Sequence, residues 1–296
     1  MRPTEAEPGA DATAERRRVQ VGCQGWNYDD WVTPRAAARP VFYPRGTRAE
    51  AMLDAYACAF DTVEVDSTFY AVPTDATFDA WARRTPEAFT FALKLPREIT
   101  HEQALRGARA AGVLGEFTRG ARRLEEKLAA VLVQMPPQFE ATRENFGALE
   151  EFLPLLPRDI RFAFEFRDTF WFDEEMLAPL ARHANVSLAL VEGPWATRER
   201  IWRAAAALLD STDFAYTRFM GERDLTRFDR VARPRDANLE RWAAAVERLR
   251  ERVPQVFAYF SNYYEGHAPA SANKLKRLLG LPVTDPDELE NQPTLF

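Results

Sequence analysis

Chemically active side chains recur where the short strand-forming runs of this sequence end. They are Gln24, Glu64, Asp66, Lys94, Gln134, Glu165, Arg167, Glu192, Arg218 and Asn262. Carboxylates and lysine can exchange protons, arginine binds carboxylate or phosphate groups, and amides orient polar ligands. If the strand ends meet at one edge of a sheet, these side chains form a site for a polar substrate.

Two glutamates and a lysine are the candidates for proton transfer. Asp66 is expected to raise a pKa of the Glu64–Asp66 pair, whereas Lys94 and Arg167 are expected to keep Glu165 ionised. Lys94 could itself act as a base or as a Schiff-base nucleophile, because an apolar barrel would lower its pKa. A lattice of ion pairs without catalysis is the alternative interpretation.

Other side chains are expected to bind the substrate. Lys94, Arg167 and Arg218 suit a phosphate or carboxylate group, since guanidinium binds such groups through two hydrogen bonds. The full predicted binding set is Gln24, Trp26, Asp66, Gln134, Arg167, Trp171, Glu192, Arg218, Asn262 and His267. The aromatic residues near strand ends could stack on a sugar or a base, or only pack the loops; they are Trp26, Trp31, Tyr43, Phe69, Tyr70, Trp171 and Tyr263.

No cofactor is evident from the sequence, and binding of a divalent metal ion is an open alternative. His101 and His267 follow the third and eighth predicted strands and could bind an ion together with Glu64 or Glu165. His183 falls at a predicted helix end, where an imidazolium favours the helix dipole. Cys23 and Cys58 are expected to be buried packing residues, and they form no CxxC motif.

The elements that must position these side chains alternate between strands and helices. Strands are predicted at Val19–Cys23, Thr62–Asp66, Phe89–Leu95, Ala130–Met135, Arg161–Arg167, Ser187–Glu192, Phe214–Phe219 and Val256–Asn262. Helices are predicted from a capping box at Thr47 to Phe60, and at Asp173–His183, Thr197–Leu209 and Asn238–Arg252. This alternation predicts an α/β fold, a TIM-type (β/α)8 barrel. A doubly wound sheet is the competitor, but no glycine-rich loop follows the first strand.

A two-residue period within the strands predicts which side chains enter the barrel. Phe162, Phe164 and Phe166 share one face of their strand, while Glu165 and Arg167 lie on the other. The apolar face should meet the helices, so the small and polar side chains should point inward.

Composition limits the organisation and the class of protein. We expect a disordered tail at 1–18, one barrel domain at 19–282 and a flexible acidic tail at 283–296. The net charge is −6, and four acids lie in the last dozen residues, so the barrel is nearly neutral and has no evident nucleic-acid-binding stripe. No apolar run is long enough to span a membrane, and no signal peptide is visible. We therefore expect a soluble, cytoplasmic protein.

The same residues resemble the YecE-like family, also called domain of unknown function 72. The resemblance runs from about Val21 to Leu281. It rests on GCQGWNYDDW, FYP, VEVDSTFYAVP, FALKLPREITH, QMPPQF, FEFRDTFW, TRFMG and YFSNYYEGHAPASA. It implies a TIM-type barrel and no established activity. Asp66 stands where the family commonly has Asn, Met220 where many members have His, and Ser261 and Tyr263 where an Asn and a His are frequent, so a His-dependent role does not carry over.

The C-terminus suggests a partner. Gln292, Leu295 and Phe296 resemble the short motif by which bacterial repair and replication proteins dock on the sliding clamp. A chance tail is the alternative. The leading hypothesis is a barrel enzyme acting on an anionic or sugar-like substrate, of hydrolase or isomerase type by fold analogy alone. The alternatives are a DNA-maintenance accessory or nuclease-like protein recruited through this tail, and a non-catalytic ligand-binding barrel.

Overall fold

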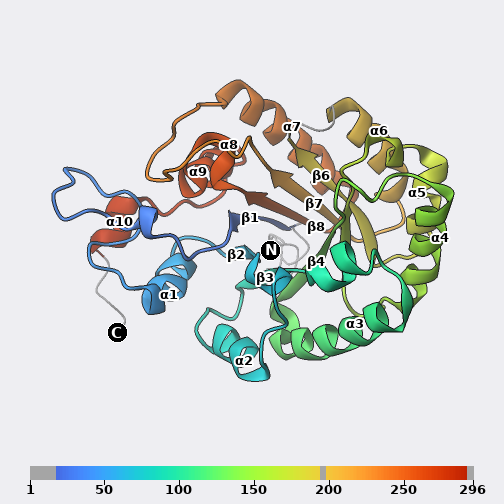
Figure 1. The fold of residues 1–296 in the computed structure, drawn as a ribbon. Helices are drawn as coiled ribbons and strands as arrows, with labels where there is room; N and C mark the ends of the chain where they lie inside the picture. The colour runs from blue at the N-terminus through green and yellow to red at the C-terminus, as the bar shows by residue number, and fades with distance from the viewer. Residues whose placement is uncertain (1–17, 194–197, 292–296) are drawn as a thin grey trace, which may run out of the picture.

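Eight parallel strands close into one barrel in chain order, β1 to β8 (Figure 1). The computed structural model describes residues 18–193 and 198–291. The strands are β1 Arg18–Gln24, β2 Thr62–Val65, β3 Thr90–Lys94, β4 Leu128–Gln134, β5 Phe162–Glu165, β6 Val186–Glu192, β7 Phe214–Phe219 and β8 Gln255–Phe260. β1 pairs with β8 along six residues, which closes the barrel. The predicted TIM-type fold and all eight predicted strands are confirmed.

Helices surround the barrel and connect its strands (Figure 1). They are α1 Met52–Ala57, α2 Asp75–Arg83, α3 Gly107–Ala121, α4 Arg143–Phe152, α5 Glu174–Ala181, α6 Arg198–Leu208, α7 Asp236–Arg252, α8 Asn262–Glu265, α9 Ala268–Leu278 and α10 Pro286–Asn291. Within the described ranges, no helix combines the length and the hydropathy needed to cross a membrane.

The outward faces of the strands carry large apolar side chains. Phe162, Phe164 and Phe166 are at most 1% exposed and belong to the main core between barrel and helices. Burying each such side chain contributes about 1.5–3 kcal/mol. The predicted two-residue period is therefore confirmed, and it leaves Glu165 on the inward face of the same strand.

The barrel interior is filled unevenly. Alanines face inward on one side, at Ala92, Ala130, Ala163 and Ala189 of β3 to β6. Rings fill the other side, at Phe214, Tyr216, Phe257 and Tyr259 of β7 and β8. Because large side chains lie opposite small ones, the barrel interior can reach the close packing that is typical of protein cores.

Two local predictions are wrong. Thr47 does not cap a helix, because its hydroxyl donates to the carbonyl of Pro44 and α1 begins five residues later. Asp173 does cap α5, by accepting from the backbone N–H of Glu175.

The second wrong prediction is that Cys58 is buried. Cys58 lies just beyond α1 and is exposed, whereas Cys23 is buried as expected.

The acidic C-terminal segment is structured as far as residue 291. It contains α10, where Leu289 is 3% exposed and Glu290 pairs with Arg45 at 2.6 Å. Within residues 283–291, this packing differs from the flexible tail that the sequence predicted. Of the predicted disordered tail at 1–18, Arg18 belongs to β1, and residues 1–17 lie outside the described residues. The motif residues Gln292, Leu295 and Phe296 also lie outside them.

Candidate active site

The carboxyl ends of the strands surround a cavity of about 110 Å³. Its lining consists of Gln24, Tyr28, Asp66, Tyr70, Lys94, Gln134, Arg218, Met220, Arg223, Ser261 and Tyr263. Five residues of the predicted site are among them: Gln24, Asp66, Lys94, Gln134 and Arg218. The sequence therefore anticipated much of the wall of this cavity.

Arg218 of β7 bridges the two predicted catalytic glutamates. Its Nη2 donates to Glu64 Oε1 at 2.7 Å and its Nε to Glu64 Oε2 at 2.9 Å, while Nη1 donates to Glu165 Oε2. All three side chains are at most 1% exposed. The guanidinium is consequently engaged by protein carboxylates and does not present a free fork to a substrate.

Further donors complete the coordination of both carboxylates. Tyr216 donates its hydroxyl to Glu64 Oε2 at 2.6 Å. Glu165 Oε1 accepts from Gln134 Nε2 at 2.7 Å and from Arg167 Nε at 3.2 Å. Both glutamates therefore lie beneath the cavity as hydrogen-bonded anchors and are absent from its lining.

The two glutamates differ in the direction of their pKa shifts, as the sequence predicted. Burial raises the pKa of Glu64, and although Arg218 opposes this, Asp66 adds to it. Burial also acts to raise the pKa of Glu165, but Arg218 and Arg167, with hydrogen bonds from Arg218 and Gln134, lower it overall. Two arginines on one carboxylate and one on the other account for the difference.

Lys94 ends β3 and presents its ammonium group to the cavity. It is 9% exposed; its Nζ lies 3.9 Å from Asp66 Oδ1 and 4.1 Å from the centroid of the Phe69 ring. Burial lowers the pKa of Lys94; Asp66 opposes this shift and Arg218 adds to it. The ammonium is thus held by one long ion pair and one ring face.

The segment after β2 fixes the position of Lys94. Thr68 is fully buried; its hydroxyl accepts from the Lys94 backbone N–H at 3.0 Å and donates to the Lys94 carbonyl at 2.7 Å. The flanking residues Asp66 and Phe69 supply the carboxylate and the ring that contact the ammonium. One short sequence, DSTF, therefore both ties down the strand end and surrounds its side chain.

Gln24 and Met220 contact each other at the cavity wall. Gln24 Nε2 donates to Met220 Sδ at 3.0 Å. A thioether accepts a weak hydrogen bond but cannot transfer a proton. Met220 therefore contributes an acceptor and no proton donor to this part of the lining.

Sequence reasoning missed several lining residues. Tyr28, whose hydroxyl donates to the Gln24 carbonyl at 3.0 Å, and the exposed Arg223 both lie in connecting loops. Loop positions have no period from which their direction could be inferred. Tyr216 also escaped notice, although it precedes Arg218 by two residues and so shares its inward face.

Three residues expected at the mouth serve packing elsewhere. Trp171 is fully buried and donates its Nε1–H to the carbonyl of Phe139 at 2.8 Å. Asn262 accepts from Trp31 Nε1 at 3.1 Å and from the Ala268 backbone at 3.0 Å. Trp26 packs edge-on against Trp81. None of the three lines the cavity, so the structure does not support their predicted role in binding a substrate there.

Three polar residues are likewise absent from the cavity lining. Glu192 accepts from Asn238 Nδ2 and Trp242 Nε1, both on α7. His267 is 4% exposed, with its Nδ1 2.8 Å from the carbonyl of Phe228. Arg167 contacts Glu165 and reaches the site through that carboxylate.

The two histidines considered as metal ligands do not come together with the glutamates. His101 Nδ1 is 2.8 Å from the Thr100 hydroxyl, and its ring packs on Phe69. Burial together with Lys94, Arg97 and Arg167 lowers the pKa of His101 to about 4. In the part of the chain that the structure describes, no group of three or more His, Cys, Asp or Glu side chains is arranged to hold a metal ion.

Comparison with known proteins agrees with the motifs. The chain is 26% identical over 287 residues to UPF0759 protein YunF of Bacillus subtilis, covering 89% of this chain and 95% of that one. It is 27% identical over 154 residues to UPF0759 protein YecE of Escherichia coli K12, covering 52% and 50%. A DUF72 family protein of Thermotoga maritima has a similar structure, with a TM-score of 0.70, 27% identity, and coverage of 88% of this chain and 99% of that one. One from Enterococcus faecalis has a TM-score of 0.68 at 20% identity, covering 90% and 100%. The model of the family described as protein of unknown function DUF72 matches residues 20–294, and this chain therefore belongs to that family.

Proposed function

We propose that this protein is an enzyme acting at the barrel mouth on a small anionic substrate that carries hydroxyl groups, such as a sugar acid. The observation that carries the proposal is Lys94. Its ammonium lines the cavity, is 9% exposed, and has a single carboxylate, that of Asp66, at 3.9 Å within the described residues. Burial lowers the pKa of Lys94, and a lysine with a lowered pKa releases its proton more readily than an exposed one.

The charges around the cavity favour an anion. Four cations lie in or beside it (Lys94, Arg167, Arg218 and Arg223), against three carboxylates (Glu64, Asp66 and Glu165). One positive charge is in excess, which matches a substrate with one negative group. A volume of about 110 Å³ admits only a small group at the bottom of the mouth.

Neutral polar groups of the lining suit the hydroxyl groups of such a substrate. Amide and hydroxyl groups come from Gln24, Tyr28, Gln134, Ser261 and Tyr263. They can donate and accept hydrogen bonds, whereas Lys94 can only donate while protonated. This mixture favours a sugar-like anion over an apolar carboxylic acid.

The two glutamates act in this proposal through Arg218 and Lys94. The carboxylates of Glu64 and Glu165 accept several hydrogen bonds beneath the cavity. They therefore position the Arg218 guanidinium and set the electrostatic potential at the Lys94 ammonium. Lys94 then exchanges the proton with substrate, in an isomerisation or a hydrolysis, the two reaction types that fold analogy suggests.

Three variants test the proposal with gluconate and glucuronate as probes and glucose as the neutral control. Lys94→Met should weaken anion binding about tenfold or more and abolish turnover, because it removes the charge. Lys94→Arg should retain most of the binding but lose turnover, because arginine does not deprotonate near neutral pH. Lys274→Met, which removes a half-buried lysine of α9 that lies outside the cavity lining and pairs with Asp236 and Glu265, should change neither.

Calorimetry measures binding, and nuclear magnetic resonance of the sugar carbons measures turnover. Full turnover by Lys94→Arg would refute the proton-transfer role. Tight binding without any turnover in the unaltered protein would favour the non-catalytic ligand-binding barrel instead. The DNA-maintenance alternative rests on residues 292–296, outside the described ranges, and is tested by deleting them.

A further inference from the structure

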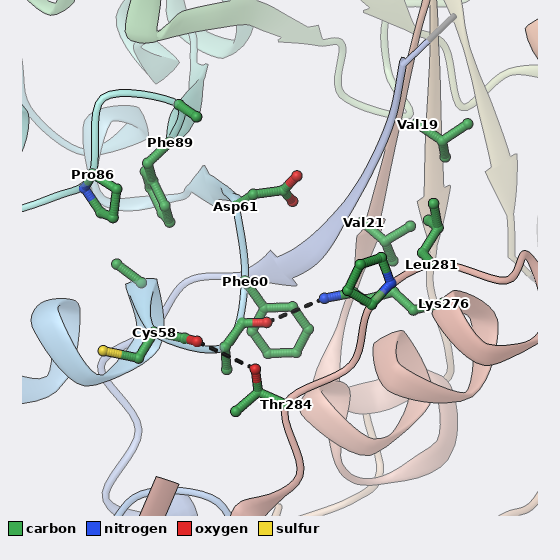
Figure 2. Close-up of a pocket in the computed structure, with 14 residues that line it drawn as sticks. Val19, Val21, Cys58, Phe60, Asp61, Pro86, Phe89, Lys276, Leu281 and Thr284 are labelled. Atoms are coloured by element: carbon green, nitrogen blue, oxygen red, sulfur yellow. Dashed lines mark hydrogen bonds between the residues drawn. The ribbon is translucent and has the colours of Figure 1, made fainter. Parts of the chain in front are cut away.

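A second cavity lies at the opposite end of the barrel from the mouth. Figure 2 shows it between the start of β1, the segment that joins α1 to β2, and the chain that follows α9. Its volume is about 280 Å³, close to the lower end of the usual range for small-molecule sites, about 300–1,000 Å³. It therefore offers room for a small molecule that does not compete with the substrate at the mouth.

Apolar side chains form most of the wall. Val19 and Val21 of β1, Phe60, Phe89 and Leu281 are all in the lining. Two hydrogen bonds join the walls across a long sequence separation: Lys276 Nζ to the Ala59 carbonyl at 3.2 Å, and the Thr284 hydroxyl to the Cys58 carbonyl at 3.3 Å (Figure 2).

One cation is buried among these apolar groups. Lys276 of α9 is 8% exposed, and its Nζ lies 5.1 Å from the centroid of the Phe60 ring. Its ammonium has three N–H donors, but the Ala59 carbonyl is its one hydrogen-bond acceptor among the described residues. Burial lowers the pKa of Lys276, with Asp61 acting in the opposite direction. An acceptor from a ligand would complete the coordination of this group.

The charge balance selects the sign of that ligand. Asp61 and Lys276 extend into the cavity from opposite sides (Figure 2). Asp61 also pairs with Arg18 at 3.7 Å, where both side chains are nearly half exposed. Because Asp61 is shared with Arg18, which lies outside the lining, the more deeply buried ammonium of Lys276 is the charge left for a ligand. A monoanion with an apolar body fits both this charge and the walls.

We infer that this cavity is a binding site for a small monocarboxylate with an apolar body, whose carboxylate accepts hydrogen bonds from the Lys276 ammonium. The apolar body lies between β1 and the Phe60 and Phe89 rings. This site goes beyond the proposed enzymatic function and does not depend on it, since the two cavities share no lining residue.

Benzoate and hexanoate are the probes, and benzamide and hexylamine are their neutral and cationic counterparts. Saturation-transfer nuclear magnetic resonance on the full-length protein should show both carboxylates binding at least about tenfold more tightly than their counterparts, because the charge-assisted hydrogen bond is lost in the latter. Lys276→Met should weaken binding of both carboxylates by a similar factor. Lys274→Met, on the same helix but outside the cavity lining, and Lys94→Met, at the mouth, should leave it unchanged.

Cys58 provides a second measurement that needs no variant. It lines the cavity and is exposed, whereas Cys23 is fully buried. Benzoate should therefore slow alkylation of Cys58 by iodoacetamide, as followed by mass spectrometry, and benzamide at equal concentration should not.

Equal binding of benzoate and benzamide would overturn the inference, as would Cys58 alkylation that benzoate leaves unchanged. Loss of benzoate binding in Lys94→Met but not in Lys276→Met would also overturn it, by placing the ligand at the mouth. Slowing of Cys58 alkylation by benzoate in the unaltered protein supports it even if Lys276→Met fails to fold.

Discussion

Replacing Arg218 by methionine tests the interpretation that this residue holds the barrel interior together. Glu64 and Glu165 are both fully buried, and each loses its main cation in the variant. Removing one partner of a buried ion pair costs about 3–5 kcal/mol, because the remaining charge stays uncompensated. For a chain of this size that corresponds to a fall in melting temperature on the order of 10 °C.

The pH dependence of this loss has a definite sign. Without Arg218, the main cation that opposes burial is gone, so the folded-state pKa of each glutamate should rise relative to the unaltered protein. The penalty is then fully present above the folded-state pKa values and shrinks as pH falls through them toward the unfolded value. The difference in melting temperature from the unaltered protein should therefore be smaller near pH 5 than near pH 7.

Thermal unfolding followed by circular dichroism measures both effects. Arg122→Met is the matched control, because its pair with Asp159 is about half exposed and should contribute at most about 1 kcal/mol. Adding Glu64→Gln and Glu165→Gln to Arg218→Met should recover part of the lost stability by removing the uncompensated charges. A melting temperature of Arg218→Met equal to that of the control, or a deficit that is the same at both pH values, would contradict this role of Arg218.

Three further outcomes are expected. Because burial lowers the pKa of Lys94, keeping it charged destabilises the folded protein below its folded-state pKa, and this cost disappears as pH rises through the unfolded-state pKa. Lys94→Met should therefore melt at or above the temperature of the unaltered protein at neutral pH. A clear loss of stability in this variant would contradict this expectation. Gly221→Ala should destabilise the barrel and disturb Tyr263, because a Cβ would lie 1.9 Å from the Tyr263 carbonyl oxygen; an unchanged melting curve would show that the backbone yields easily. Deleting Gln292–Phe296 should abolish calorimetric binding to a bacterial sliding clamp while leaving the melting temperature unchanged; the clamp prediction is wrong if the full-length chain does not bind, or binds equally well without these residues.

The barrel could be predicted from the sequence because apolar and polar residues alternate along its strands. In a strand such as Phe162–Glu165, alternate residues must face either the helices or the interior, and large apolar against small or polar side chains reveal which. The same alternation, together with where each strand ends, predicted that Glu64, Lys94, Glu165 and Arg218 lie at one end of the barrel.

The contacts within the site depended on information that strand phase does not contain. The length of the Arg218 side chain relative to the width of the barrel decides whether it contacts Glu64, Glu165 or a substrate. In the structure it contacts both glutamates. Trp171 and Asn262 lie beyond strand ends, where the local backbone turns them toward Phe139 and Trp31. Such turns depend on packing between distant segments, so short motifs at strand ends overestimate the number of residues that face the mouth.

The uneven filling of the barrel determines where a new pocket could be engineered. An alanine such as Ala130 or Ala163 already lies against its neighbours at 0% exposure, so enlarging it would strain the sheet. Trimming Phe257, whose ring lies among the rings of Phe214, Tyr216 and Tyr259, would instead leave a void inside the barrel, large enough for a benzene-sized guest. Remodelling of the interior should therefore begin on β7 and β8, where ring-sized volumes can be vacated without moving the backbone.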